Sequence, residues 1–105
     1  MFEKSSLQDI QHTVHDWITK HGGYWPPLAM LAAVIEEVGE LAKEINHLEG
    51  YKPKKSVNKK AKMGEELADI LYAIICIANY YKIDLNVELK STIKKYSDRD
   101  LNRFI

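Results

Sequence analysis

The order of apolar and polar positions predicts a chain built from helices. Apolar residues recur three or four positions apart between a capping box, Ser5 with Gln8, and a stop at His21-Gly22-Gly23. These residues are Leu7, Ile10, Val14, Trp17 and Ile18. Because such a stripe occupies one face of a helix, it packs on a neighbour, and Trp17 is expected in the core. We find no alternating pattern typical of a strand.

Three more helices follow. The second is expected to begin near Pro27, since proline is favoured at the first helical position, and to end before Gly50 and Pro53. A polar loop at 49–58 leads to a third helix over about 60–81, whose second half is apolar almost all round. Asp84 is placed to cap the fourth helix. A helix that is apolar on several sides needs several neighbours. We therefore expect an all-α four-helix bundle, completed by dimerisation, with residues 1–105 forming a single domain.

Composition and charge narrow the classes of function. The 105 residues carry 15 Lys and Arg against 15 Asp and Glu, so no overall field attracts a nucleic acid polymer or an anionic membrane. The apolar runs are too short to span a bilayer and the N-terminus has no signal-peptide core, so we expect a cytoplasmic protein. Cys76 lies in an apolar run and cannot form an internal disulfide, which favours a buried thiol in a reducing compartment.

Four carboxylates share helix faces with apolar residues: Glu37 and Glu40 on the second helix, Glu66 and Asp69 on the third. A carboxylate beside a core stripe is costly unless it is paired or protonated, and facing carboxylates also repel each other. A hard divalent cation removes both costs. Oxygen-only ligands favour Mg²⁺, with Mn²⁺ as a substitute. The structural alternative is an acidic patch neutralised by the lysines at 52–62, because both spacings are common on helices.

Other metal patterns fit less well. Glu44-x-x-His47 has the spacing of a di-iron ligand pair, but the third helix carries Asp69 where a second pair needs histidine. His12 and His15 lack a neighbouring acid pattern suited to zinc and are expected on the surface. The chain shows neither a phosphate-binding glycine loop nor a nucleophile triad.

Two motifs resemble those of a known family. Glu36-Glu37-Val38-Gly39-Glu40 and Glu65-Glu66-Leu67-Ala68-Asp69 are similar to the Glu-Glu-x-x-Glu and Glu-x-x-Asp motifs of the MazG-like nucleotide pyrophosphohydrolases, in the all-α NTP pyrophosphatase superfamily. The likeness to the small single-domain members extends through residues 22–30, 44–47, 52–55 and 95–100. It implies a helical bundle that forms dimers, sometimes tetramers. It also implies Mg²⁺-dependent hydrolysis of a nucleoside triphosphate to the monophosphate and pyrophosphate, with a role in cleaning the nucleotide pool.

The resemblance also implies roles for individual residues. The metal ligands would be Glu37, Glu40, Glu66 and Asp69. Glu36 would act with Glu37 in catalysis, as a ligand of a second metal ion or by orienting water. Lys95 and Arg99 would contact phosphate, either from one helix face or, if Ser97-Asp98 ends the helix, with Arg99 in a mobile tail.

The same residues fit two other functions. A non-catalytic helical dimer could bind metal or nucleotide as a sensor or adaptor, without turnover. Phosphoribosyl-ATP pyrophosphatase belongs to the same superfamily, but the likeness to the small MazG-like proteins is closer. Base selection depends on the shape of the pocket, for which Trp25, Tyr24 and His21 are candidates. The ring of Trp25, at a loop-to-helix junction, can stack on a base or pack against the protein.

Overall fold

The computed structural model describes residues 5–50 and 59–103, and it confirms the all-α prediction. The four helices are α1 (Leu7–Lys20), α2 (Pro27–Leu48), α3 (Lys59–Tyr80) and α4 (Leu85–Arg103). None of the described residues lies in a strand. The predicted polar loop falls outside the described residues from position 51 to 58, and so does the lysine-rich motif at 52–55.

The start of α1 corrects the predicted capping box by one residue. Ser6, not Ser5, is the N-cap: its Oγ accepts from the Asp9 backbone N–H at 3.1 Å, and its own N–H donates to Asp9 Oδ2 at 3.0 Å. A carboxylate is a stronger acceptor than the Gln8 amide, so Asp9 closes the box. The pKa of Asp9 is lowered by these hydrogen bonds with Ser6.

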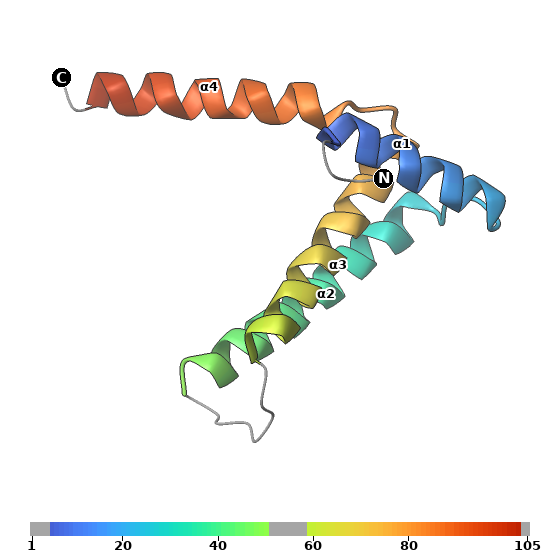
Figure 1. Cartoon of the computed structure of the whole chain (residues 1–105), viewed down its shortest axis with the longest axis horizontal. Coiled ribbons are helices and arrows are strands. Elements are labelled where there is room, and N and C mark those ends of the chain that lie inside the picture. The colour runs from blue at the N-terminus through green and yellow to red at the C-terminus, as the bar shows by residue number, and fades with distance from the viewer. Residues whose placement is uncertain (1–4, 51–58, 104–105) are drawn as a thin grey trace.

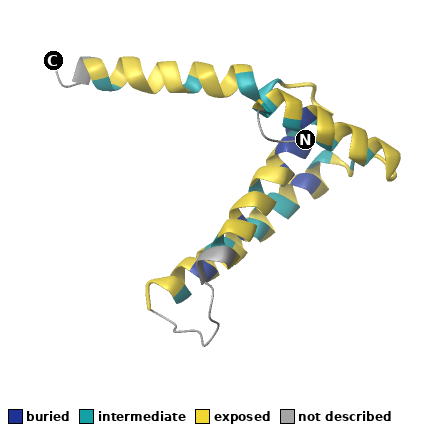
Figure 2. Ribbon diagram, in the orientation of Figure 1, coloured by how far each residue is buried: buried dark blue, intermediate teal, exposed yellow. Residues whose placement is uncertain are grey.

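Helices α2 and α3 lie side by side along their length, and α1 crosses one end of the pair (Figure 1). The α2 start at Pro27 is confirmed. Buried residues follow the seam between the helices (Figure 2). The apolar ones are Met30 from α2 and Ala73, Ile75, Cys76 and Ala78 from α3, and Glu44 and Glu66 are also buried. Cys76 is thus buried as predicted, and burial raises the pKa of its thiol.

A buried amide, Gln11, joins three helices at the crossed end. Its Nε2 donates to Asn79 Oδ1 at 3.0 Å and to the Ile83 carbonyl at 2.9 Å, and its Oε1 accepts from the Leu85 N–H at 2.8 Å. Asn79 Nδ2 donates in return to the Gln11 carbonyl at 3.0 Å. At this joint α4 begins with the predicted Asp84 cap, whose Oδ1 accepts from two backbone amides of the first turn.

From this joint α4 leaves the other helices. Its axis is bent by 110° from that of α3, and it packs near its start against α1 (Figure 1). Large apolar side chains on α4 and on the outer face of α2 remain exposed in the single chain: Leu28, Ile35, Val38, Val87, Leu89, Ile93 and Leu101.

No one helix in the described part of the chain is both long enough and apolar enough to cross a membrane. The bent pair of α3 and α4 passes the same test by length and composition only.

Candidate functional site

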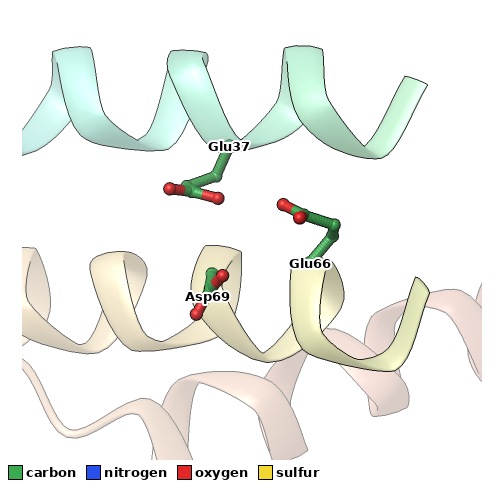
Figure 3. Close-up of side chains that lie close together, drawn as sticks. All are labelled: Glu37, Glu66 and Asp69. Carbon is green, nitrogen blue, oxygen red and sulfur yellow. The ribbon is translucent and has the colours of Figure 1, made fainter. Parts of the chain in front are cut away.

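Three of the four predicted metal ligands converge between α2 and α3. Glu37 extends from α2 toward Glu66 and Asp69, which lie one turn apart on α3 (Figure 3). Each offers a carboxylate oxygen, and these oxygens lie within 4.8 Å of one another. Glu66 is only 4% exposed, Glu37 is half-buried and Asp69 is exposed. The acidic cluster therefore lies where the core meets solvent.

Glu40, the fourth predicted ligand, lies one turn beyond Glu37 and does not belong to the converging group. The buried positions of α2 advance by seven residues, from Met30 through the half-buried Glu37 to Glu44. This spacing leaves Glu40 exposed at the edge of the buried stripe. Glu36 is also exposed, and its charge acts on Glu37. The roles of Glu36 and Glu40 stay predictions.

The electrostatics of the cluster favour a bound cation. Burial raises the pKa of Glu37, and a hydrogen bond with Glu66 together with the negative charges of Asp69 and Glu66 raises it further. Glu37 thus carries its charge at a cost in the metal-free molecule. A donor set made only of carboxylate oxygens suits a hard divalent ion, so these residues fit the metal that the sequence predicts.

Lys62 lies beside the acidic cluster, although the sequence pattern indicated only that it belongs to a run of lysines. Its Nζ lies 3.0 Å from Glu66 Oε1 and 3.7 Å from Glu65 Oε2. The hydrogen bond and the charge of Glu66 raise the pKa of Lys62, and Glu44 adds to the effect. The four-residue spacing from Lys62 to Glu66 is the sequence signal that could have placed this cation beside the cluster.

A cavity of about 400 Å³ adjoins the cluster. Glu37 and Asp69 form part of its wall, and most of the remaining lining is apolar or aromatic. The three candidates His21, Tyr24 and Trp25 all line it, so the α1–α2 loop forms one wall of this cavity.

The prediction that Trp17 lies in the core is wrong, because this residue lines the cavity. Its side chain is 56% exposed, near the end of α1, where that helix crosses the α2–α3 pair. Its ring stacks on His21, with centroids 4.2 Å apart, and its carbonyl lies 2.6 Å from His21 Nδ1. Since a carbonyl oxygen only accepts, this contact places a proton on Nδ1. An aromatic residue one turn before a glycine-rich loop was the available signal.

The two predicted phosphate contacts lie elsewhere. Lys95 and Arg99 are exposed on α4, which continues to Arg103, so Arg99 belongs to the helix and not to a tail. Their cationic groups lie 4.9 and 4.6 Å from the centre of the Tyr96 ring. No described residue of α4 lines the cavity, and the helix runs away from the α2–α3 pair (Figure 1). Within one chain the structure therefore does not bring these cations to the acidic cluster.

Comparison with known proteins identifies the family. Residues 26–104 match the MazG nucleotide pyrophosphohydrolase domain. The Bacillus subtilis (strain 168) protein YpjD is 40% identical over 100 residues, which cover 94% of this chain and 90% of YpjD.

Two solved structures share the fold. The crystal structure of YPJD from Bacillus subtilis superposes with a TM-score of 0.81 at 39% identity, over 90% of this chain and 97% of that one. The crystal structure of the Bacillus-conserved MazG protein, a nucleotide pyrophosphohydrolase, gives a TM-score of 0.77 at 37% identity, over 90% of this chain and 92% of that one.

Proposed function

Because the chain belongs to the MazG nucleotide pyrophosphohydrolase family, we propose that it hydrolyses a nucleoside triphosphate to the monophosphate and pyrophosphate with the help of Mg²⁺. The observation that carries this proposal is the convergence of Glu37, Glu66 and Asp69 beside an aromatic-walled cavity. The carboxylates suit a metal ion, which could in turn bind the phosphates, and the cavity suits a nucleoside.

Each part of the site has a proposed task. Glu37, Glu66 and Asp69 hold the metal, with Glu40 one turn away as a further ligand. When bound, Mg²⁺, or Mn²⁺ in its place, neutralises phosphate charge and makes a coordinated water more acidic. Glu36 orients the water that attacks the α-phosphorus and accepts its proton, while pyrophosphate leaves. Lys62, paired with Glu66, supplies positive charge from the same chain.

The base and sugar are proposed to occupy the cavity. Its volume of about 400 Å³ falls within the usual range for small-molecule sites. Trp25 is 65% exposed and lines the cavity, so its ring face is accessible for stacking on a base. This arrangement favours stacking as the role of Trp25.

We further propose that the functional unit is a homodimer in which the partner completes the site. The exposed apolar side chains of α2 and α4 give a second copy a surface to cover. Since α4 runs away from its own acidic cluster, Lys95 and Arg99 would meet the substrate's phosphates in the site of the second copy. A dimer of this kind would explain why both cations lie on a projecting helix.

Pyrophosphate release from a panel of canonical and modified nucleoside triphosphates tests the proposed activity. With Mg²⁺, the wild-type protein is expected to turn over at least one of them. Glu37→Gln and Asp69→Asn should abolish turnover while leaving the helical circular dichroism spectrum unchanged. Glu88→Gln, which changes an exposed carboxylate on α4, is the matched control and should keep full activity.

The outcomes separate the alternatives. Full activity in both cluster variants would show that the assigned site is wrong. Thermal stabilisation by Mg²⁺ and nucleotide without any product, across the whole panel, would favour the non-catalytic sensor or adaptor. Selective turnover of phosphoribosyl-ATP would identify the other superfamily activity.

A further inference from the structure

The α1–α2 loop that carries Trp25 has little packing of its own. Its glycines, Gly22 and Gly23, have φ angles of 111° and 87°, and a side chain at either would meet no atom within 4 Å. Backbone hydrogen bonds from the His21 and Gly23 N–H groups to the Ile18 carbonyl, at 3.0 and 2.9 Å, tie the first residues of the loop to α1 but do not reach Trp25. Glycine gives the chain wide conformational freedom, so the loop needs another constraint to hold Trp25 in place.

Tyr24, the neighbour of Trp25, supplies that constraint. Its hydroxyl lies 2.8 Å from His15 Nδ1, and the two rings stack with centroids 5.7 Å apart. The Tyr80 ring, at the end of α3, meets Tyr24 edge-on, with ring centroids 6.4 Å apart. Tyr24 therefore connects the loop both to α1 and to α3.

The protonation of Tyr24 suits this contact. A tyrosine hydroxyl is protonated at neutral pH, and burial raises its pKa further. The hydroxyl can therefore donate to His15 Nδ1. The hydrogen bond and the ring stacking together hold the Tyr24 side chain in orientation as well as in position.

We propose that His15 is a positioning residue for nucleotide binding, an inference that rests on the proposed function. His15 does not line the cavity beside Glu37 and Asp69. It acts through Tyr24, which lines that cavity and precedes Trp25. Holding the loop in its binding conformation before substrate arrives reduces the entropy that binding must overcome. The contact should therefore affect the affinity for nucleotide and leave the chemical step alone.

The kinetic test compares three variants with the wild-type enzyme. His15→Ala should raise KM for the preferred triphosphate about five-fold with kcat nearly unchanged, as expected for the loss of one ordinary hydrogen bond. His15→Asn, whose amide can occupy the place of Nδ1, should restore KM. His12→Ala removes another exposed histidine, three residues earlier on α1, and should change neither constant. An equal fall in kcat and kcat/KM, or an unchanged KM, in His15→Ala would overturn the proposal.

A second readout needs no turnover. The chain has two tryptophans, so Trp17→Phe leaves Trp25 as the single fluorophore. In this background His15→Ala should increase the fast, local component of Trp25 fluorescence anisotropy decay, and His15→Asn should not. Identical decays in the two variants would overturn the loop-positioning role. If the wild-type protein released no pyrophosphate, the proposed activity would fail, while the anisotropy would still decide the role of His15.

Discussion

At the residue scale, Glu37 shows how a functional charge weakens a fold. It is half-buried, hydrogen-bonded to Glu66 and close to the charge of Asp69. All three conditions disfavour its ionised form, as its raised pKa reflects. The carboxylates of the acidic cluster thus repel one another in the metal-free protein, and the proposed metal ion would relieve this repulsion.

The substitution Glu37→Gln should therefore raise the melting temperature of the metal-free protein. The folded pKa of Glu37 lies above its unfolded value, so the ionised group costs stability at pH values above the folded pKa. This cost disappears as the pH falls through that pKa, because the folded protein takes up the proton. Thermal melts in the presence of chelator measure this effect. The melting temperature of Glu37→Gln should clearly exceed that of the wild-type protein at about pH 7.5, and the difference should be small at pH values well below the raised pKa. Glu88→Gln should show no such pattern, and a lower melting temperature for Glu37→Gln at neutral pH would contradict this account.

At the scale of the elements, Gln11 connects α4 to the rest of the fold. Its buried side chain makes part-buried hydrogen bonds with Asn79 of α3, with the Ile83 carbonyl and with the first residue of α4. A hydrogen bond that is shielded from water contributes more to stability than an exposed one, because water cannot replace it. We therefore expect this one polar residue of α1 to stabilise the joint at which α4 begins.

Comparison of two glutamines measures this dependence. Gln11→Ala should lower the free energy of unfolding by about 2 to 3 kcal/mol, since it removes three part-buried hydrogen bonds that a buried side chain makes with Asn79, Ile83 and Leu85. Gln8→Ala removes an exposed hydrogen bond to Asp84, three residues earlier on α1, and should cost less than about 1 kcal/mol. Urea unfolding followed by circular dichroism gives both values. Equal losses would show that burial of Gln11 does not set its contribution.

Local signals explain how far the elements could be predicted. The proline start of α2 and the Asp84 cap act within a few residues, and both were confirmed. The predicted capping box, Ser5 with Gln8, was wrong by one residue. The sequence also allows a box of Ser6 with Asp9, and the stronger acceptor, the Asp9 carboxylate, decides between the two. The course of α4 could not be predicted, since it depends on contacts between Gln11 and residues about 70 positions away.

The site followed the same rule. Helical spacing placed Glu66 and Asp69 on one face, and the apolar stripe turned Glu37 toward them. The exposure of Glu40 and the position of Trp17 beside the cavity depend on how α2 and α1 pack on α3. The aromatic residue before the glycine-rich loop indicated a possible pocket, but the spacing of apolar residues alone placed Trp17 in the core.

At the scale of the whole molecule, the projecting α4 makes the proposed dimer testable. If α4 serves the partner's site, Glu37→Gln and a Lys95→Ala/Arg99→Ala double variant carry defects in different parts of one composite site. Each variant alone should be inactive or nearly so. After subunit exchange in an equal mixture, half the dimers are mixed and each has one intact site, so about a quarter of wild-type activity should return.

The alternative arrangement predicts a different result. If Lys95 and Arg99 served their own chain, both sites of every mixed dimer would be damaged and no activity would return. Light scattering on the same samples checks that dimers form, and a monomeric wild-type protein would contradict the proposed assembly.

The division of the cavity between helices has a consequence for the evolution of this enzyme. Carboxylates on α2 and α3 supply the proposed chemistry, while the end of α1 and the following loop supply the aromatic walls. If the nucleoside occupies this cavity as proposed, substitutions at Trp17, His21 or Trp25 can change the preferred base without altering the proposed metal ligands. A lineage could acquire a new substrate by drift in one short segment, with its hydrolytic machinery under unbroken selection.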